Sequence, residues 1–263
     1  MIKTLQFILL FFNKLIEFTG LTVIRRAKLL RLEKLSKFYF NDPFLQLFKM
    51  PEIVLKYIPL SQSQIRQDLF VLSELDFKRF GFFVEIGGGD GINGSNTFLM
   101  EKFFNWKGII SEPGLSYLVN LNLNRDCFVD NRLVYNESNL ILDFEDSGEG
   151  LSTITKYANF GIHGESRKSL KNTQRKILSV SLNDLLKEAN APRDIDYISI
   201  DTEGSEFEII SRFNFDDYNV RIFTIEHNFE KEIRSSIFYL MQKNGYSRIF
   251  ENISHQDDWY IKN

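Results

Sequence analysis

The chain has 263 residues, of which 43% are hydrophobic and 25% are charged, so it can bury a full core and is unlike a disordered or collagenous protein. Its net charge of -3 predicts no general affinity for nucleic acid. The single cysteine, Cys127, excludes an intrachain disulfide and a CxxC metal site, and it fits a cytoplasmic location.

Residues 1–60 are predicted to form a helical extension that is both basic and hydrophobic. The first 50 residues contain nine Lys or Arg residues against three Asp or Glu residues. Their longest unbroken apolar run, FILLFF, is far shorter than the ~20 residues of a membrane-spanning helix. Two interpretations stay open: residues 1–40 lie in a membrane interface as a basic amphipathic helix, or they pack on the main domain or on a second subunit.

Short apolar segments alternate with amphipathic segments from Phe82 onward, which is typical of an α/β protein with a parallel sheet. The strand-like segments, each with an acidic residue at or next to its end, are 82–86 (FFVEI), 108–112 (GIISE), 197–201 (YISID) and 222–226 (IFTIE). The segments with helical spacing are 95–104, 116–123, 181–189 and 232–243. Ser181 has Asp184 three residues on, a variant of the capping box that marks a helix start.

A polar segment over residues 143–176 interrupts this alternation. It contains four glycines and His163. Long excursions of this kind form lids or substrate loops, or else they are solvated insertions without contact to the chemistry. Both interpretations stay open, and His163 receives no role.

The stretch FFVEIGGGDGING fits two glycine patterns that predict different cofactors. Glu85, Gly87, Gly89 and Gly91 form an acid followed by alternating glycines, which is typical of methyl-donor enzymes. Gly89, Gly91 and Gly94 form the GxGxxG pattern of dinucleotide sites. In an open α/β sheet, either pattern lies beyond the carboxyl ends of the strands, where glycines let the backbone approach a ligand.

The charge around the glycines favours S-adenosylmethionine over a dinucleotide. Glu112 lies 21 residues beyond Gly91, where either cofactor needs a carboxylate that accepts the two ribose hydroxyls. Glu85 and Asp90 would repel a pyrophosphate, whereas they can accept hydrogen bonds from the ammonium group of S-adenosylmethionine.

The spacing Tyr239-x-x-x-Lys243 matches the proton relay of short-chain dehydrogenases. Two fixed residues in five arise often by chance, and an ordinary amphipathic helix explains them.

Two alternatives to a methyltransferase stay open: an NAD(P)-dependent oxidoreductase, and a non-catalytic nucleoside-binding scaffold whose N-terminal helices recruit a partner.

The chain resembles the FkbM family of S-adenosylmethionine-dependent methyltransferases over residues 61–263. The stretches that carry the resemblance are SQSQIRQD, FVEIGGGDGINGSNTFLMEKFFNWKGIISEP, GLSTI, IDYISIDTEGSEFEII, TIEHNF and DDWYI. The resemblance implies a Rossmann-like class I methyltransferase fold, with a seven-stranded, mostly parallel sheet, its last strand antiparallel and helices on both faces. It also implies O-methylation of a hydroxyl on a small-molecule or glycan acceptor, such as a sugar or a secondary metabolite.

The catalytic candidates follow the last two strand-like segments, which are expected to be neighbours in a sheet of this topology. Their ends would bring Asp201 and Glu226 within about 5–6 Å, the spacing of adjacent strands. With Glu203 close by, these carboxylates must share a proton, bind a cation or meet a positive partner. The sequence therefore predicts a catalytic set of Asp201, Glu203, Glu226 and His227.

The same carboxylates, Asp201, Glu203 and Glu226, are candidate ligands of a divalent metal, with His227 or Asn228 as a further ligand. His227 is the most suitable general base, because an unperturbed imidazole accepts a proton near neutral pH. Alternatively, His227 orients a carboxylate or a backbone group, since consecutive residues on a regular strand face opposite sides.

The residues predicted to contact the cofactor come from the glycine turn, the end of the second strand and the turn after the third. Asn131 reaches the adenine edge or is a turn residue. Asn96 caps the following helix or contacts the cofactor. The family resemblance implies that Ser152 faces the acceptor, and no other feature of the sequence supports this role. The predicted cofactor-binding set is Glu85, Gly87, Gly89, Asp90, Gly91, Asn96, Glu112 and Asn131.

Overall fold

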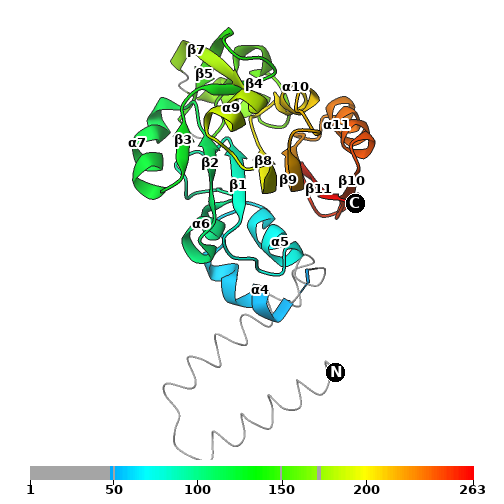
Figure 1. Cartoon of the computed structure of the whole chain (residues 1–263). Helices are drawn as coiled ribbons and strands as arrows, with labels where there is room; N and C mark the ends of the chain where they lie inside the picture. The colour runs from blue at the N-terminus through cyan, green and yellow to red at the C-terminus, as the bar shows by residue number, and fades with distance from the viewer. Residues whose placement is uncertain (1–47, 50, 149, 171–172) are drawn as a thin grey trace, which may run out of the picture. The chain divides into compact units, whose positions relative to one another are not determined.

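The structure is a computed structural model that describes residues 48–49, 51–148, 150–170 and 173–263 (Figure 1). The chain divides into two units, Met1–Leu55 and Lys56–Asn263, whereas the boundary predicted from the sequence lies at residues 60–61. The predictions made for residues 1–40 lie outside the described residues. Across the described ranges, no helix is both long enough and apolar enough to cross a membrane.

A seven-stranded sheet forms the centre of the second unit, with the strand order β10-β11-β9-β8-β1-β2-β3. Its strands are β1 (Phe82–Ile86), β2 (Lys107–Ser111), β3 (Phe128–Asp130), β8 (Asp194–Ile200), β9 (Asn219–Glu226), β10 (Tyr246–Ile249) and β11 (Asp257–Lys262). The last strand, β11, runs antiparallel to β9 and β10, whereas the pairs among β9, β8, β1, β2 and β3 are parallel. The prediction of a mostly parallel, seven-stranded sheet is therefore confirmed.

The parallel register brings several strand ends to one edge of this sheet. Glu85 of β1 is level with Ile110 of β2 and with Ser199 of β8. Ile200, the last residue of β8, is level with Ile225 of β9. The predicted adjacency of the strands that precede Asp201 and end at Glu226 is confirmed, and it puts both carboxylates at the same edge.

Helices cover both faces of the large sheet. They are α5 (Gln67–Glu74), α6 (Phe98–Phe104), α7 (Leu115–Asn124), α9 (Leu182–Glu188), α10 (Glu206–Ser211) and α11 (Lys231–Lys243). Earlier in the chain, α4 (Pro51–Tyr57) crosses the boundary between the two units, and a short 3-10 turn, η1 (Ile58–Leu60), follows it. Leu185 of α9 and Ile237 of α11 share a buried cluster with Tyr260 of β11. On the opposite face, Phe70 of α5 stacks on Trp259 with ring centroids 4.6 Å apart. Burial on both faces explains the nearly continuous apolar runs of the strands.

The helix that begins after Ser181 shows how the local sequence fixes an element. The Ser181 Oγ accepts a hydrogen bond from the backbone N of Asp184 at 3.1 Å. This bond satisfies one of the free N–H groups at the start of α9. The predicted start of this helix is therefore confirmed.

A second sheet of four strands, in the order β4-β7-β5-β6, lies at one end of the large sheet (Figure 1). Its strands are β4 (Leu133–Tyr135), β5 (Ile141–Asp146), β6 (Thr153–Ile154) and β7 (Thr173–Ser181). A 3-10 turn, η2 (Thr155–Tyr157), and α8 (Gly164–Ser169) connect β6 to β7. The polar segment 143–176 thus contains regular structure, because Phe144 and Ile154 are buried in a small separate core with Leu133, Tyr135 and Ile177.

Candidate active site

A cavity of about 290 Å³ lies where the ends of β1, β2, β8 and β9 face the second sheet, close to the lower end of the ~300–1,000 Å³ typical of ligand pockets. From the large sheet and its loops it is lined by Gln64, Ile86, Gly87, Gly88, Gly89, Asn93, Gly94, Ser111, Glu112, Pro113, Tyr117, Asp201, Thr202, Glu203, Glu226 and Gln256. From the second sheet and its connections it is lined by Leu133, Val134, Phe144, Gly150, Leu151, Ser152, Ile162 and His163.

The glycine turn after β1 lies directly against the segment that follows β8. Gly87 has a φ of +91°, and a Cβ atom on it would lie only 1.8 Å from the backbone O of Asp201. Its backbone N donates to Ser111 O at 2.9 Å. Only glycine permits this backbone conformation together with this approach. The turn therefore connects the ends of three strands at the floor of the cavity.

Glu112, directly after β2, faces the same cavity as the glycine turn. Its Oε2 accepts a hydrogen bond from Gly89 N at 2.8 Å, and its Oε1 accepts one from Gly114 N at 2.6 Å. Burial raises the pKa of Glu112 to about 7, against the effect of these two backbone hydrogen bonds. The two hydrogen bonds thus fix the carboxyl group of Glu112 beside the glycine turn.

Glu85 is buried and lies outside the cavity lining. Its carboxylate accepts hydrogen bonds from Ser95 Oγ at 2.9 Å, Asn96 N at 2.6 Å and Thr97 Oγ1 at 2.5 Å. The guanidinium of Arg125 lies 3.5 Å away. In this structure Glu85 therefore organises the start of α6 behind the glycine turn.

Four other predicted cofactor residues also lie outside the lining. The Oδ1 of Asp90 accepts hydrogen bonds from the backbone N of Ile92 and of Asn93, so it closes its own turn. Asn96 is buried and donates from Nδ2 to Ser199 Oγ at 2.9 Å. The other two are Gly91 and the exposed Asn131. From the predicted cofactor set, the structure brings Gly87, Gly89 and Glu112 together at the cavity.

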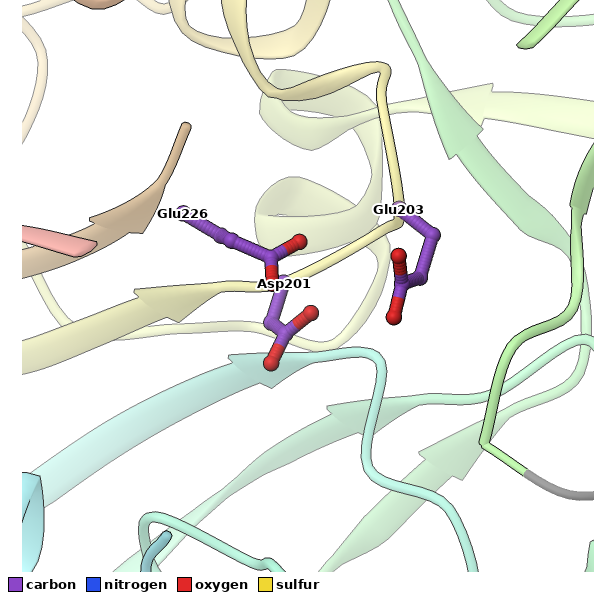
Figure 2. Close-up of side chains that lie close together, drawn as sticks. All are labelled: Asp201, Glu203 and Glu226. Carbon is purple, nitrogen blue, oxygen red and sulfur yellow. The ribbon is translucent and has the colours of Figure 1, made fainter. Parts of the chain in front are cut away.

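Three carboxyl groups meet on the other side of the glycine turn. Asp201 follows β8, Glu203 lies in the next turn, and Glu226 ends β9. One oxygen from each of the three lies within 4.8 Å of the other two. Figure 2 shows the three side chains close together, Asp201 and Glu203 from the same stretch of backbone and Glu226 from another. The structure thus brings three of the four predicted catalytic residues together at the cavity.

Burial and mutual repulsion oppose full ionisation of this group. Burial, then the nearby Glu203 and Glu206, raises the pKa of Asp201 to about 8. Burial raises the pKa of Glu203 to about 7, and burial followed by Asp201 raises that of Glu226 well above its usual value. Carboxyl groups in this state hold protons near neutral pH or accept a cationic partner.

Arg167 of α8 supplies one positive partner from the second sheet's connections. Its guanidinium pairs with Glu203 Oε2, and it donates to the backbone O of Leu151 at 3.1 Å and of Phe160 at 2.8 Å. Thr153 Oγ1 adds a hydrogen bond to Glu203 O at 2.9 Å. These contacts attach the segment that walls the cavity to the turn after β8.

His227 is buried but lies outside the cavity lining. Its Nδ1 accepts a hydrogen bond from Phe229 N at 3.0 Å, and its Nε2 lies 3.7 Å from Asp258 Oδ1. Burial lowers its pKa to about 4. Because β9 stays regular up to Glu226, the next side chain faces the opposite way. The structure therefore does not bring His227 together with the three carboxylates.

Sequence reasoning left two residues near the cavity without a role. His163 lines it, although the sequence showed only a lone histidine in a polar segment. Arg167 reaches Glu203 across 36 positions of sequence, and no local pattern marks such a partner. Ser152, expected to face the acceptor, does line the cavity.

Comparison with known proteins identifies the family. No curated protein matches the chain in sequence. Among solved structures the chain is similar to the precorrin-6y C5,15-methyltransferase from Geobacter metallireducens GS-15, with 13% identity, 74% of this chain and 85% of that chain covered, and a TM-score of 0.39. The family model "Methyltransferase FkbM domain" matches residues 85–248. The chain therefore belongs to the FkbM methyltransferase family, and this membership implies S-adenosylmethionine as the methyl donor.

Proposed function

We propose that the protein transfers a methyl group from S-adenosylmethionine to a hydroxyl of a sugar, a glycan or a secondary metabolite. The observation that carries this proposal is a single cavity in which Glu112 and the glycine turn stand on one side and Asp201, Glu203 and Glu226 on the other. The first group suits a nucleoside, and the second suits the reacting end of the donor and its acceptor.

The charge of the cavity supports this donor over a dinucleotide. The described residues of the lining include four carboxyl groups and no lysine or arginine. A pyrophosphate would be repelled here, whereas the sulfonium and ammonium groups of S-adenosylmethionine would be attracted. Glu112 is placed to accept the ribose hydroxyls, since its backbone hydrogen bonds fix its orientation.

The acceptor side provides a base in the form of a carboxylate with a raised pKa. In the in-line displacement, the acceptor oxygen lies ~3 Å from the methyl carbon and opposite the sulfur. The oxygen–carbon bond forms as the carbon–sulfur bond breaks, which neutralises the sulfonium. The hydroxyl proton passes to one of Asp201, Glu203 or Glu226, each of which has a pKa raised above that of an ordinary carboxyl and so accepts a proton more readily.

Calorimetry with two ligands tests the choice of cofactor. We expect S-adenosylhomocysteine to bind the purified full-length chain in the micromolar range and NADH to show no binding. The opposite result would reject the methyltransferase assignment of this cavity in favour of an oxidoreductase.

Mass spectrometry of cells tests catalysis and identifies the acceptor. Polysaccharides and small molecules from cells with and without the gene should differ by a methyl-sized mass in at least one species. Cells that carry Asp201→Ala should lack that species. If S-adenosylhomocysteine binds but the methylated species are identical in all three cell lines, the protein is a nucleoside-binding scaffold.

A further inference from the structure

We propose that Asp201, Glu203, Glu226 and Asn228 form a site for one divalent cation that prefers oxygen ligands, such as Mg²⁺, Mn²⁺ or Ca²⁺. A role of this cation in methyl transfer rests on the proposed function. The binding itself depends only on the geometry and charge of these four side chains.

The three carboxylates are close enough to contact one ion. One oxygen from each lies within 4.8 Å of the others, so a point exists no more than about 2.8 Å from all three, because 4.8 Å divided by the square root of three is about 2.8 Å. Calcium–oxygen distances are ~2.3–2.6 Å, and magnesium–oxygen distances are ~2.0–2.1 Å. Small side-chain movements therefore suffice, and they are smaller for Ca²⁺ than for Mg²⁺. In Figure 2 the space between the carboxyl groups of Asp201 and Glu203 is where these oxygens converge.

Asn228 provides an independent indication of a ligand. The residue is 2% exposed, and its Nδ2 lies 2.6 Å from Glu226 Oε2 and 3.4 Å from Glu203 Oε2. Its Oδ1 is buried and accepts no hydrogen bond from the part of the chain that the structure describes. A half-turn about the Cβ–Cγ bond exchanges nitrogen and oxygen with almost no change of shape. The amide can therefore donate to the carboxylates without a cation and offer its unpartnered oxygen to one that is bound.

The balance of charge also favours a cation. The guanidinium of Arg167 pairs with Glu203. Within the described ranges, neither Asp201 nor Glu226 has an ion-pair partner, and the residues that line the cavity include no lysine or arginine. Asp201 and Glu226 are therefore buried without a positive neighbour, and a divalent ion supplies the charge that would stabilise both groups as carboxylates.

The position of the site suggests which acceptors suit it. A cation with six or more oxygen ligands that takes four from this site keeps at least two positions for other oxygens. Two neighbouring hydroxyls of a sugar match that requirement. A hydroxyl bound in this way loses its proton more readily, as water does on a metal ion.

Manganese binding to the full-length protein, freed of metal with a chelator, tests the proposal. The electron paramagnetic resonance signal of free Mn²⁺ should show one bound ion per chain at about pH 8, and binding should release protons, because the ligands must be deprotonated to hold the ion. Asp201→Asn and Glu226→Gln should weaken binding by more than ~100-fold, and Asn228→Leu by ~10- to 100-fold. Asn228→Asp should tighten it, because it adds a fourth carboxylate. Asp143→Asn, which alters an exposed carboxylate paired with Lys176, is the matched control and should change nothing.

Calorimetry with S-adenosylhomocysteine on the same samples separates this proposal from the proposed function. Cofactor binding without Mn²⁺ binding would overturn the cation site and leave the methyltransferase intact. Equal Mn²⁺ binding by the native chain and by Glu226→Gln would also overturn it. If Asp201→Asn or Glu226→Gln fails to fold, weaker or unchanged Mn²⁺ binding by Asn228→Asp would overturn the proposal on its own. A native chain that binds Mn²⁺ but not S-adenosylhomocysteine would support the cation site and contradict the proposed function.

Discussion

Glu112 is predicted to link cofactor binding to pH, because burial raises its pKa to about 7 while its carboxyl group faces the cavity. A carboxylate accepts hydrogen bonds from ribose hydroxyls more strongly than a protonated carboxyl does. We expect the affinity for S-adenosylhomocysteine to rise as pH increases from about 6 to about 8, with proton release on binding at the lower pH. Calorimetry in buffers of different ionisation enthalpy measures both effects. Glu112→Gln should bind more weakly and with little dependence on pH, and a pH-independent affinity of the native chain would contradict this role.

Arg125 is predicted to stabilise the glycine turn from behind. It is buried, donates to Gly91 O at 3.1 Å and pairs with Glu101 at 2.9 Å. Arg125→Met should lower the free energy of unfolding by about 3–5 kcal/mol, because it removes the buried positive charge beside the buried carboxylates of Glu85 and Glu101. Lys102→Met is the control, since the more exposed Lys102 also pairs with Glu101 and should cost no more than ~1 kcal/mol. Urea denaturation measures the free energy of unfolding of both variants. An equal decrease in the two variants would contradict the predicted role of Arg125.

The sequence showed which residue types surround the glycine turn but not what each of them contacts. Glu85 and Asp90 were assigned to the cofactor because their charge suits it. In the structure Glu85 accepts hydrogen bonds from three groups at the start of α6, and Asp90 closes its own turn. Such contacts depend on the path of the chain after the turn, which spacing and charge do not determine. Glu112 could be foreseen, because the end of the neighbouring strand fixes its place.

The turn between β1 and α6 is predicted to depend on a single glycine, Gly87. Gly87→Ala should cost more than ~2 kcal/mol and weaken S-adenosylhomocysteine binding, because its Cβ would meet Asp201 O at 1.8 Å. Gly245→Ala is the matched control: its φ is also positive, at +82°, but a Cβ there meets nothing within 4 Å. It should cost about 1–2 kcal/mol for the backbone conformation alone and leave binding unchanged. Thermal denaturation and calorimetry measure the two effects, and similar results for both glycines would show that the contact with Asp201 is unimportant.

Strands of the large sheet were predictable because burial on both faces gives them apolar runs that local composition reveals. The segment 82–86 coincides with β1, and the adjacency of β8 and β9 followed from the topology. The second sheet was not predicted, since β5 buries only Phe144 and Asp146 and half of its sequence, ILDFED, is acidic. Its partner β7 comes later in the chain, so only the tertiary structure completes the pairing.

The two sheets are joined at the cavity through Arg167, whose guanidinium contacts Glu203 and the backbone O of Leu151 and Phe160. Arg167→Met should therefore loosen the segment 150–163 while the large sheet stays folded. Hydrogen exchange with mass spectrometry should show faster exchange in that segment and unchanged exchange in β8. Lys168→Met is the control, because Lys168 is exposed and pairs with the exposed Glu165. Faster exchange throughout the chain would instead mean that Arg167 stabilises the whole fold.

Part of the cavity wall opposite the large sheet comes from a single stretch of the chain, and this affects how the preference for an acceptor can change. Gly150, Leu151, Ser152, Ile162 and His163 all come from one short stretch, whereas the carboxylates come from the ends of β8 and β9. Under the proposed function, the groups that carry out the transfer and these groups facing the acceptor are therefore encoded in separate parts of the gene. Replacement of residues 150–163 by the corresponding stretch of a relative should exchange the acceptor while the donor and the chemistry stay the same. Such a division lets one scaffold diversify its products through a single interchangeable stretch.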